Sequence, residues 1–127
     1  MILGIGVDTI DIQRFAAWHS YSRKKLLRIF SSQEIDYCLE DVNKSAERFA
    51  VRFAAREALY KALSHAYPHK KIPFLTLCAR ITITKIDGRP HILIRDDIGI
   101  DLSILTIHLS LSHSHTAAMA FIVIERR

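Results

Sequence analysis

The chain begins with an alternating pattern that predicts a strand over residues 2–7. The odd positions of this segment are apolar, whereas the even positions after Ile2 are the glycines Gly4 and Gly6, followed by Asp8. Because side chains alternate between the faces of a strand, one face is apolar and the other is nearly bare and ends in a carboxylate. Glycine inside a strand often marks close approach by another backbone or by a ligand. Two interpretations remain open: a tight packing site with Asp8 capping the following turn, or a ligand site that includes Asp8.

Helical patterns dominate the rest of the first half. Helices are expected at residues 11–30, 31–39 and 49–63. The first is basic and has no acidic residue between Gln13 and Gln33. The second opens with Ser31 and Glu34 in the pattern of a capping box. The third is rich in Ala, Leu, Arg and Glu, which favour helix, and Pro68 bounds it.

The second half changes to the period of strands. Strands are expected at residues 81–84, 91–94, 105–112 and 117–125. Asp87–Gly88 separates the first two, which predicts a hairpin whose loop Arg89–Pro90 lengthens. In residues 105–112 the odd positions are apolar and are expected to face inward, while residues 97–102 are either a short helix or a loop. The predicted class is therefore α+β, with an N-terminal strand and helices followed by a mainly antiparallel sheet.

Composition narrows the class of protein. A chain of 127 residues suggests one domain over residues 1–127 with a real core. Half of the residues are hydrophobic, which is compatible with apolar surface covered by partner subunits. No apolar run is long enough to span a membrane, and we see no signal peptide. Cys38 and Cys78 lack metal or redox spacing, so we expect buried thiols in a reducing cytoplasm.

Charge points to an anionic partner. The formal net charge is +5, which suits a nucleic acid, a phosphorylated ligand, a membrane surface or an acidic protein. Charge alone does not choose among these partners.

Glu57 and Lys61 carry the clearest chemistry of the third helix. A four-residue offset places them side by side, and alanines around them leave a shallow notch. Arg52 and Arg56 are expected to line an adjacent row. The plain alternative is a surface ion pair worth a few tenths of a kcal/mol. Two carboxylates, Asp8 and Glu57, would suit Mg²⁺, which takes one or two carboxylates together with waters and substrate phosphates.

Three motifs carry a resemblance to a known family. They are Gly4–Asp8 (GIGVD), Arg52–Ala62 (RFAAREALYKA) and His108–His113 (HLSLSH), in that order. Together they resemble the small bacterial holo-acyl-carrier-protein synthases of the 4'-phosphopantetheinyl transferase superfamily. The likeness spans almost the whole chain, including the closing apolar strand.

The resemblance implies a reaction and a set of site residues. The 4'-phosphopantetheine group of coenzyme A would move to a serine of apo acyl carrier protein, in support of fatty acid biosynthesis, with release of adenosine 3',5'-bisphosphate. Asp8 and Glu57 would hold Mg²⁺ against the pyrophosphate, and Lys61 would add a cation on the leaving side. The serine proton would go to Glu57 or to a water on the metal. The nucleotide phosphates would be bound by Arg52, Arg56, Ser64 and His108; an ordinary polar position on a sheet face is the alternative for His108.

The resemblance also implies partners. Acyl carrier proteins are acidic, so the basic segment would recognise one through Arg14, Arg23, Lys24, Lys25 and Arg28, with Trp18 as an apolar anchor. The alternative is a solvated basic face with Trp18 in the core. The family further implies a cytoplasmic homotrimer whose active sites lie between subunits, with no nucleic acid and no membrane.

The chain departs from the family pattern at three points. The family usually has glycine soon after the Lys61–Ala62 dipeptide, where this chain has residues 63–68 (LSHAYP). Backbone contacts to phosphate are in doubt there, although Ser64 offers a donor. Arg56 replaces the commoner lysine, which changes geometry but not charge, and Thr9 stands where a branched apolar residue is usual.

Two rival functions follow from the same residues. A metal nuclease or phosphohydrolase would need further carboxylates at the site, and Asp11, Asp96, Asp97 and Asp101 are the available ones. A nucleic-acid-binding module without catalysis would fit the charge, but no RNP, KH or zinc-finger pattern is present.

Overall fold

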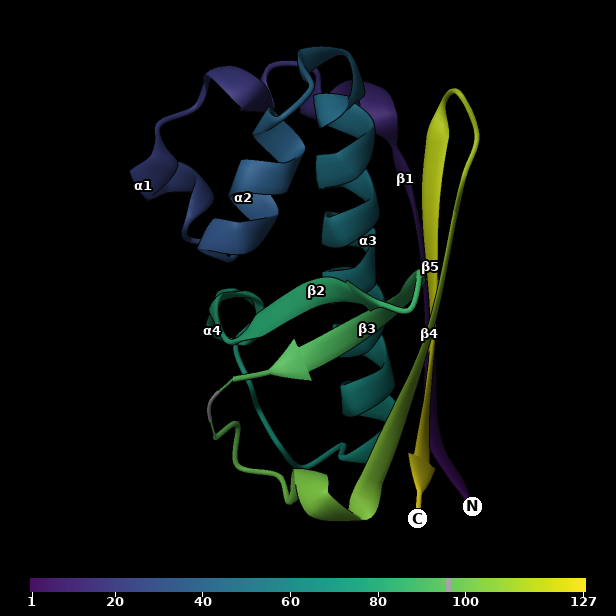
Figure 1. Ribbon diagram of the computed structural model, residues 1–127. Helices are drawn as coiled ribbons and strands as arrows, with labels where there is room; N and C mark the ends of the chain where they lie inside the picture. Colours follow the sequence, from purple (N-terminus) through teal and green to yellow (C-terminus); the bar gives the residue numbers. More distant parts are fainter. Residues whose placement is uncertain (96) are drawn as a thin grey trace.

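The computed structural model describes residues 1–95 and 97–127 (Figure 1). The elements follow in the order β1 (Ile2–Asp11), η1 (Ile12–Phe15), η2 (Trp18–Ser20), α1 (Arg23–Leu26), α2 (Ser32–Leu39), α3 (Val42–Ala66), α4 (Phe74–Ala79), β2 (Ile81–Ile86), β3 (Arg89–Ile94), η3 (Leu102–Ile104), β4 (Leu105–His113) and β5 (Ala117–Arg126). The α+β class is confirmed.

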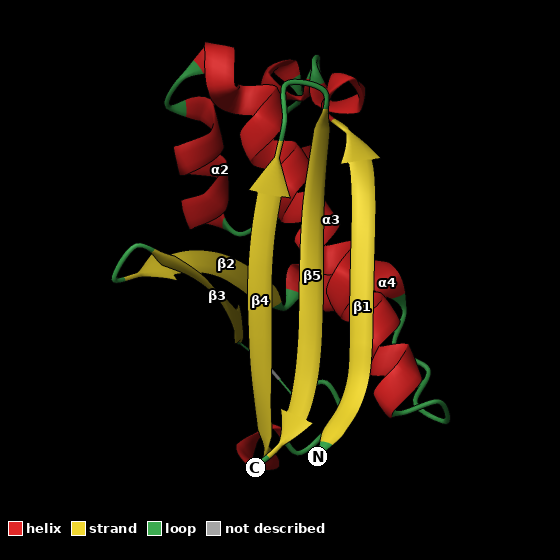
Figure 2. Cartoon of the chain, turned by 90° about the vertical axis from the view of Figure 1, so that its right-hand side faces the viewer, coloured by secondary structure: helices red, strands yellow, loops and turns green. Residues whose placement is uncertain are grey.

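Two antiparallel sheets form in the described residues. β1, β5 and β4 lie side by side in that order, and β2 pairs with β3 as a hairpin. The long helix α3 covers one face of the three-stranded sheet, and no helix of the described residues covers the other (Figure 2). The hairpin crosses α3 beyond the β4 edge (Figure 1).

The bare face of β1 packs directly against α3. A Cβ on Gly6 would overlap the Ala58 carbonyl oxygen and approach the Ala62 nitrogen, and one on Gly4 would meet Ala62 and Ala66. The glycines therefore serve close approach by another backbone. The apolar odd positions of β1 point the other way, onto the uncovered sheet face.

Alanines and aromatic rings fill the space around α3. The buried alanines of this helix are Ala50, Ala54, Ala55, Ala58 and Ala62. At its N-terminal half, buried phenylalanines from α3, η1 and the segment before α2 pack together as Phe15, Phe30, Phe49 and Phe53. Small residues toward the sheet and large ones on the opposite side place α3 at the centre of the core.

The basic segment is not one helix, contrary to the prediction for residues 11–30. It forms three short turns, and Ser22 caps the last of them because its Oγ accepts the Lys25 N–H at 3.2 Å. Phe15 and Leu26 are buried, whereas most residues between them are exposed. A helix without a sustained apolar stripe lacks the packing that normally stabilises it.

The structure confirms the capping box and the hairpin that the sequence predicted. The capping box at α2 is confirmed, with the Ser31 N–H donating to Glu34 Oε1 at 2.9 Å. The Asp87–Gly88 hairpin is confirmed with both residues at positive φ, and residues 89–90 begin β3 rather than lengthening the loop. The helix α4 was not predicted. It starts directly after Pro73, and proline is tolerated at the start of a helix.

The burial of the two cysteine thiols matches expectation. Cys38 and Cys78 are buried free thiols, and desolvation raises the pKa of each to about 12, so neither is a ready nucleophile. Within residues 1–95 and 97–127, no helix combines the length and the apolar character needed to cross a bilayer.

The contact between β1 and α3 predicts the effect of adding one methyl group. Gly6→Ala should lower the free energy of unfolding by about 2–3 kcal/mol, since overpacking against backbone forces the two elements apart. Urea denaturation measures this value. Gly88→Asn is the control, because Gly88 has open space around it and asparagine tolerates its φ of 77°. Equal stability of the two variants would contradict the packing described.

Candidate active site

Asp8, Glu57 and Lys61 gather where β1 passes α3. The Lys61 Nζ lies 3.3 Å from Asp8 Oδ1 and donates a hydrogen bond to the Val7 carbonyl at 3.1 Å. The Asp8 side chain is 16 % exposed and that of Lys61 53 % exposed. The structure therefore brings together two residues 53 positions apart in the sequence and leaves their charged ends within reach of a ligand.

Glu57 belongs to the same cluster on electrostatic grounds. Partial burial raises its pKa, and the nearby negative charge of Asp8 raises it further, while Lys61 and Arg14 act in the opposite direction. Two carboxylates that oppose each other's ionisation favour an additional cation between them. Arg14 is thereby also located beside this cluster.

The donor set fits Mg²⁺ better than a transition metal. Within the described part of the chain, no group of three or more His, Cys, Asp or Glu residues is arranged to hold a metal ion. Asp8 and Glu57 supply two carboxylates, which is the usual protein share for a Mg²⁺ that also binds water and phosphate. The fit rests on hard oxygen donors and on the charge repulsion between them.

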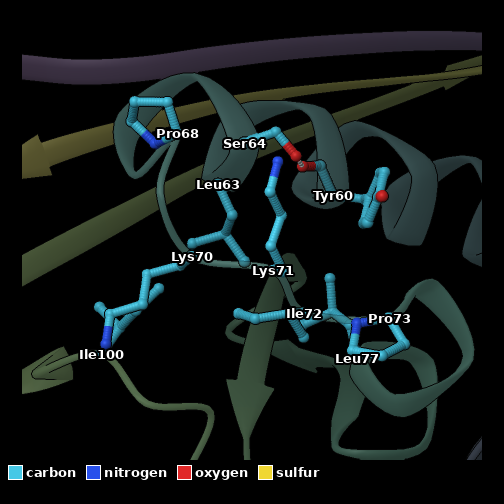
Figure 3. Close-up of a pocket in the computed structure, with 10 residues that line it drawn as sticks. All are labelled: Tyr60, Leu63, Ser64, Pro68, Lys70, Lys71, Ile72, Pro73, Leu77 and Ile100. Atoms are coloured by element: carbon cyan, nitrogen blue, oxygen red, sulfur yellow. Dashed lines mark hydrogen bonds between the residues drawn. The ribbon is translucent and has the colours of Figure 1, made fainter.

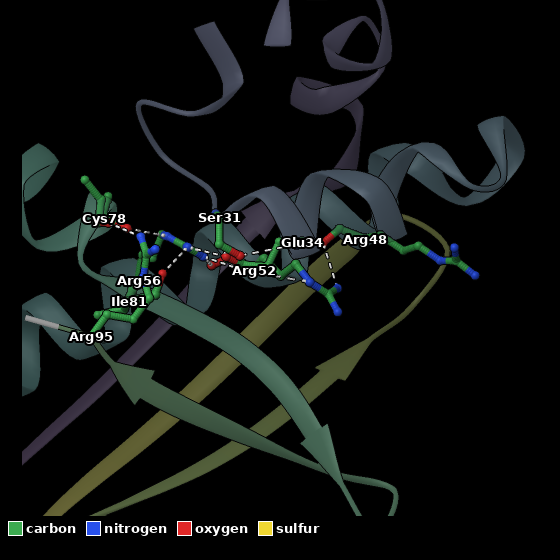
Figure 4. A network of polar contacts seen from close by, with 9 residues as sticks. Ser31, Glu34, Arg48, Arg52, Arg56, Cys78, Ile81 and Arg95 are labelled. Atoms are coloured by element: carbon green, nitrogen blue, oxygen red, sulfur yellow. Dashed lines mark hydrogen bonds and ion pairs between the residues drawn. The ribbon is translucent and has the colours of Figure 1, made fainter. Parts of the chain in front are cut away.

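Arg56 does not face this cluster, and the expectation that it binds nucleotide phosphates is wrong. Its side chain is fully buried and pairs with Glu34 through two hydrogen bonds, at 2.6 and 2.8 Å (Figure 4). The remaining donors reach the carbonyl oxygens of Ile81 at 3.0 Å, Arg52 at 3.3 Å and Cys78 at 3.4 Å. This guanidinium joins α2, α3 and the start of β2 from within the core.

Arg52 is also turned away from Glu57 and Lys61. Nine residues at about 100° each leave it about half a turn around the helix from Lys61, so the expected adjacent row does not exist. Its Nε lies 3.9 Å from Glu34 Oε2, and its guanidinium lies 4.7 Å from the Tyr37 ring. Arg52 instead borders a basic cavity of about 330 Å³, which is also lined by Lys44, Arg48 and Lys85.

The strand histidines are placed differently from the prediction. His108 lies on the uncovered face of β4, with its Nε2 3.1 Å from Glu125 Oε1, so within one chain it does not join the Asp8 cluster. His113, to which the sequence assigned no role, ends β4 and lines the same cavity as Arg52. The two histidines lie on opposite faces of β4, because side chains alternate between the faces of a strand and these residues are five positions apart.

Ser64 borders another cavity, of about 260 Å³, beside the end of α3 (Figure 3). Its Oγ donates to the Tyr60 carbonyl at 2.9 Å, so the hydroxyl is already engaged. Lys70 and Lys71 from the following loop line the same cavity. The sequence reasoning missed this lysine pair, although two adjacent cations between Pro68 and Pro73 are a visible signal.

The basic segment remains exposed, but Trp18 does not. Arg14, Arg23, Lys24, Lys25 and Arg28 are all exposed. The Trp18 ring instead packs 4.4 Å from Phe15 and contacts the rings of α3, with centroids 6.1 Å from Phe53. Trp18 is partly buried and packs against the core, which favours the alternative, and its role as an apolar anchor for the carrier protein stays a prediction.

The carboxylates that a nuclease would need do not gather here. Asp11, Asp97 and Asp101 belong to no metal-ligating group in the described residues, and Asp96 lies outside them. Asp101 instead caps η3 by accepting from the Ser103 N–H at 3.0 Å.

The buried pair of Glu34 and Arg56 predicts a large and pH-dependent stability effect. Burial alone would raise the pKa of Glu34, but its hydrogen bonds to and attraction by Arg56 outweigh burial and lower the pKa. This stabilisation is present above the ordinary glutamate pKa and is lost as pH falls through the lowered value. Glu34→Gln should cost about 3–5 kcal/mol at neutral pH, because it leaves a buried charge without a full partner.

Urea titrations from neutral to acidic pH measure this prediction. In the variant, the acid-induced loss of stability should be smaller than in the unchanged chain. Glu40→Gln is the control, since Glu40 is exposed and 3.9 Å from Arg48, and such pairs contribute under about 1 kcal/mol. A loss at Glu34 no greater than at Glu40 would contradict the buried ion pair.

Comparison with known proteins identifies the family. Residues 4–120 match the family profile described as the 4'-phosphopantetheinyl transferase superfamily. The holo-[acyl-carrier-protein] synthase of Micrococcus luteus is 34 % identical over 130 residues, which cover 100 % of this chain and 94 % of that protein. The enzyme of the same name from Geotalea daltonii is 35 % identical over 136 residues and is covered completely.

Solved structures agree with this match. The complex of the synthase with coenzyme A from Chronobacterium ammoniagenes superimposes with a TM-score of 0.80 at 28 % identity, covering 98 % of this chain and 97 % of that one. A holo-(acyl-carrier-protein) synthase from Bacillus anthracis, in complex with coenzyme A (3',5'-ADP), gives 0.77 at 29 % identity, covering 100 % and 99 %. With the fold, the motifs and full-length relatives in agreement, the chain belongs to the 4'-phosphopantetheinyl transferase superfamily, among the holo-[acyl-carrier-protein] synthases.

Proposed function

We propose that this chain transfers the 4'-phosphopantetheine group of coenzyme A to a serine of apo acyl carrier protein and releases adenosine 3',5'-bisphosphate. The observation that carries the proposal is the cluster of Asp8, Glu57 and Lys61 between β1 and α3. Two carboxylates and one cation suit a substrate whose reactive centre is a diphosphate. The names of the relatives support the same reaction.

Asp8 and Glu57 are proposed to hold Mg²⁺. When bound, this ion would neutralise charge on the phosphoryl group and on the leaving phosphate. The raised pKa of Glu57 supports the assignment, because a cation relieves the repulsion that the two carboxylates feel without one.

Lys61 and Glu57 supply the chain's own chemistry in this proposal. Phosphoryl transfer depends chiefly on positioning and on stabilisation of charge. The Lys61 ammonium is held by Asp8 and by the Val7 carbonyl, which keeps a positive charge where the leaving phosphate would gain a negative one. Among the chain's own side chains, Glu57 is our candidate for receiving the serine proton, with a water molecule as the alternative acceptor.

The exposed basic segment is proposed to dock the acidic carrier protein. Its cations lie on η1, on α1 and just after α1, and Arg14 joins this surface to the carboxylate cluster because its charge acts on Glu57. Opposite charges on two partners accelerate their encounter and fix their orientation. Arg14 is therefore the member of the basic surface expected to act nearest the reacting serine.

Assembly as a homotrimer is proposed with active sites between subunits. The uncovered sheet face carries Ile5, Val7, Met119 and Phe121, which are 44–49 % exposed. An apolar face of this kind is commonly covered by a partner. Arg52 and the basic cavity that it lines with His113 are proposed to bind phosphate in a site formed between subunits. Residues 1–127 are proposed to act as one domain, in the cytoplasm, in fatty acid biosynthesis.

Mass spectrometry of the carrier protein tests the reaction. Incubation with the chain, coenzyme A and Mg²⁺ should add about 340 Da to apo acyl carrier protein, the mass of one phosphopantetheinyl group, and removal of the metal should stop the gain. Asp8→Asn and Glu57→Gln should each lower the rate by about 100-fold or more, as expected when charge stabilisation of a transition state is lost.

Asp87→Asn is the matched control for both variants. Asp87 is an exposed carboxylate in the hairpin turn at a φ of 53°, which asparagine accepts. The control should keep the rate of the unchanged chain. Full activity of either site variant, or no mass gain with the unchanged chain, would refute the assignment.

Arg14→Ala tests the docking surface. The variant should raise the KM for the carrier protein by about tenfold and weaken its dependence on salt, because exposed charges steer association. The affinity for coenzyme A should stay unchanged in calorimetry. Arg89→Ala, at the exposed start of β3, provides the control. A defect confined to coenzyme A would show that Arg14 serves the nucleotide instead.

A further inference from the structure

We propose that Lys71 is a second phosphate-binding cation of this site, acting beside Lys61 on the diphosphate of the donor. This inference rests on the proposed function. It starts from the cavity of about 260 Å³ that lies between the end of α3, the segment 68–73 and α4. Lys71 lines this cavity, and none of the motifs shared with the family includes it.

The position of the cavity connects Lys71 to the carboxylate cluster. Ser64 and Tyr60, which form its helical wall, lie three residues after and one residue before Lys61. Residues three apart on a helix are neighbours, with Cβ atoms about 5–6 Å apart. Lys61 and Ser64 therefore lie next to each other on an exposed strip of α3. Lys61 faces β1, and Ser64 borders the cavity.

The lysine side chains of the cavity point in opposite directions. Lys71 extends back toward α3, with its ammonium end directed at Ser64 and Tyr60 (Figure 3). Lys70 runs toward Ile100 on the other side (Figure 3), where its Nζ lies 3.9 Å from the position of a Cβ added to Gly99. Two adjacent residues of equal charge are thus separated, and only Lys71 approaches the strip that carries Lys61.

The loop that carries Lys71 is anchored on both sides. The Tyr67 N–H donates to the Leu63 carbonyl at 2.8 Å, and the Lys70 N–H donates to the Tyr67 carbonyl at 3.0 Å. After the loop, the Phe74 ring packs edge-on against Tyr60 with centroids 5.5 Å apart. An anchored backbone lowers the entropy lost when a side chain engages a ligand, which favours a binding role for Lys71.

The chemistry of the cavity suits the donor. A cationic end would meet the diphosphate, and the apolar wall of Leu63, Ile72 and Leu77 would meet the uncharged chain that follows it. The last turn of a helix also attracts cations through its carbonyl groups, so Lys71 has a reason to lie there without any ligand. A binding measurement distinguishes a role in ligand binding from a role in capping the helix.

Calorimetric titration of coenzyme A into the unchanged chain, Lys71→Ala and Lys70→Ala, with Mg²⁺ present, provides that test. Lys71→Ala should weaken binding by about tenfold, as expected for one hydrogen bond between a cation and a phosphate. Lys70→Ala removes the same charge from the next residue and should change affinity less than twofold. Equal losses in both variants would reduce the effect to net charge and overturn the inference.

Titration with dephospho-coenzyme A shows which phosphate Lys71 contacts. Dephospho-coenzyme A lacks the 3'-phosphate but keeps the diphosphate, so Lys71→Ala should weaken its binding by the same factor. A loss seen only with coenzyme A would place Lys71 on the 3'-phosphate and contradict the proposal. If Lys71→Ala binds coenzyme A as tightly as the unchanged chain and still transfers the phosphopantetheine arm, the role of Lys71 is refuted and the proposed function stands. If the unchanged chain does not bind coenzyme A, the proposed function is overturned as well.

Discussion

The close contact between β1 and α3 is the constraint on which the rest of the structure depends. Two glycines on one face of β1 let the backbone of α3 approach, and alanines on α3 leave the room on the other side. A side chain at Gly4 or Gly6 would separate the elements, because the atoms it would meet are backbone atoms of the helix. The pair of carboxylates exists only because this separation is short.

The charged residues of α3 lie on different sides of the helix, where some stabilise the core and others belong to the proposed site. Arg56, on the buried side of α3, satisfies Glu34 and several backbone carbonyls. Glu57 and Lys61, on the side toward β1, keep charged ends near solvent. A rotation of about 100° per residue is enough to place neighbours such as Arg56 and Glu57 in different environments. The charged residues of this motif therefore serve two purposes, an internal ion pair with Glu34 and a proposed ligand site.

Local signals in the sequence predicted most of the fold. The capping box, the two-residue hairpin turn and the alternating final strands depend on residues close together in the chain, and the structure confirms them. The break of residues 11–30 into short turns was not predictable in this way, because it depends on how few of those side chains the core accepts.

Long-range partners limited the prediction of the site. The role of Arg56 was predicted wrongly, since its partner Glu34 lies 22 residues away and the capping box already explained that carboxylate. The sequence likewise favoured His108 over His113, although the basic cavity is lined by His113. Asp8 and Lys61, whose charged ends lie 3.3 Å apart, belong to distant motifs that the family resemblance, rather than periodicity, connected.

We propose that β1 and α3 together present a single cation site. A crystal structure of the chain with Mg²⁺ and coenzyme A tests it most directly, and an anomalous signal from Mn²⁺ in place of Mg²⁺ would identify the ion. We expect one cation between the carboxylates of Asp8 and Glu57, in contact with the diphosphate. A cation bound elsewhere, or a diphosphate remote from both carboxylates, would contradict the account.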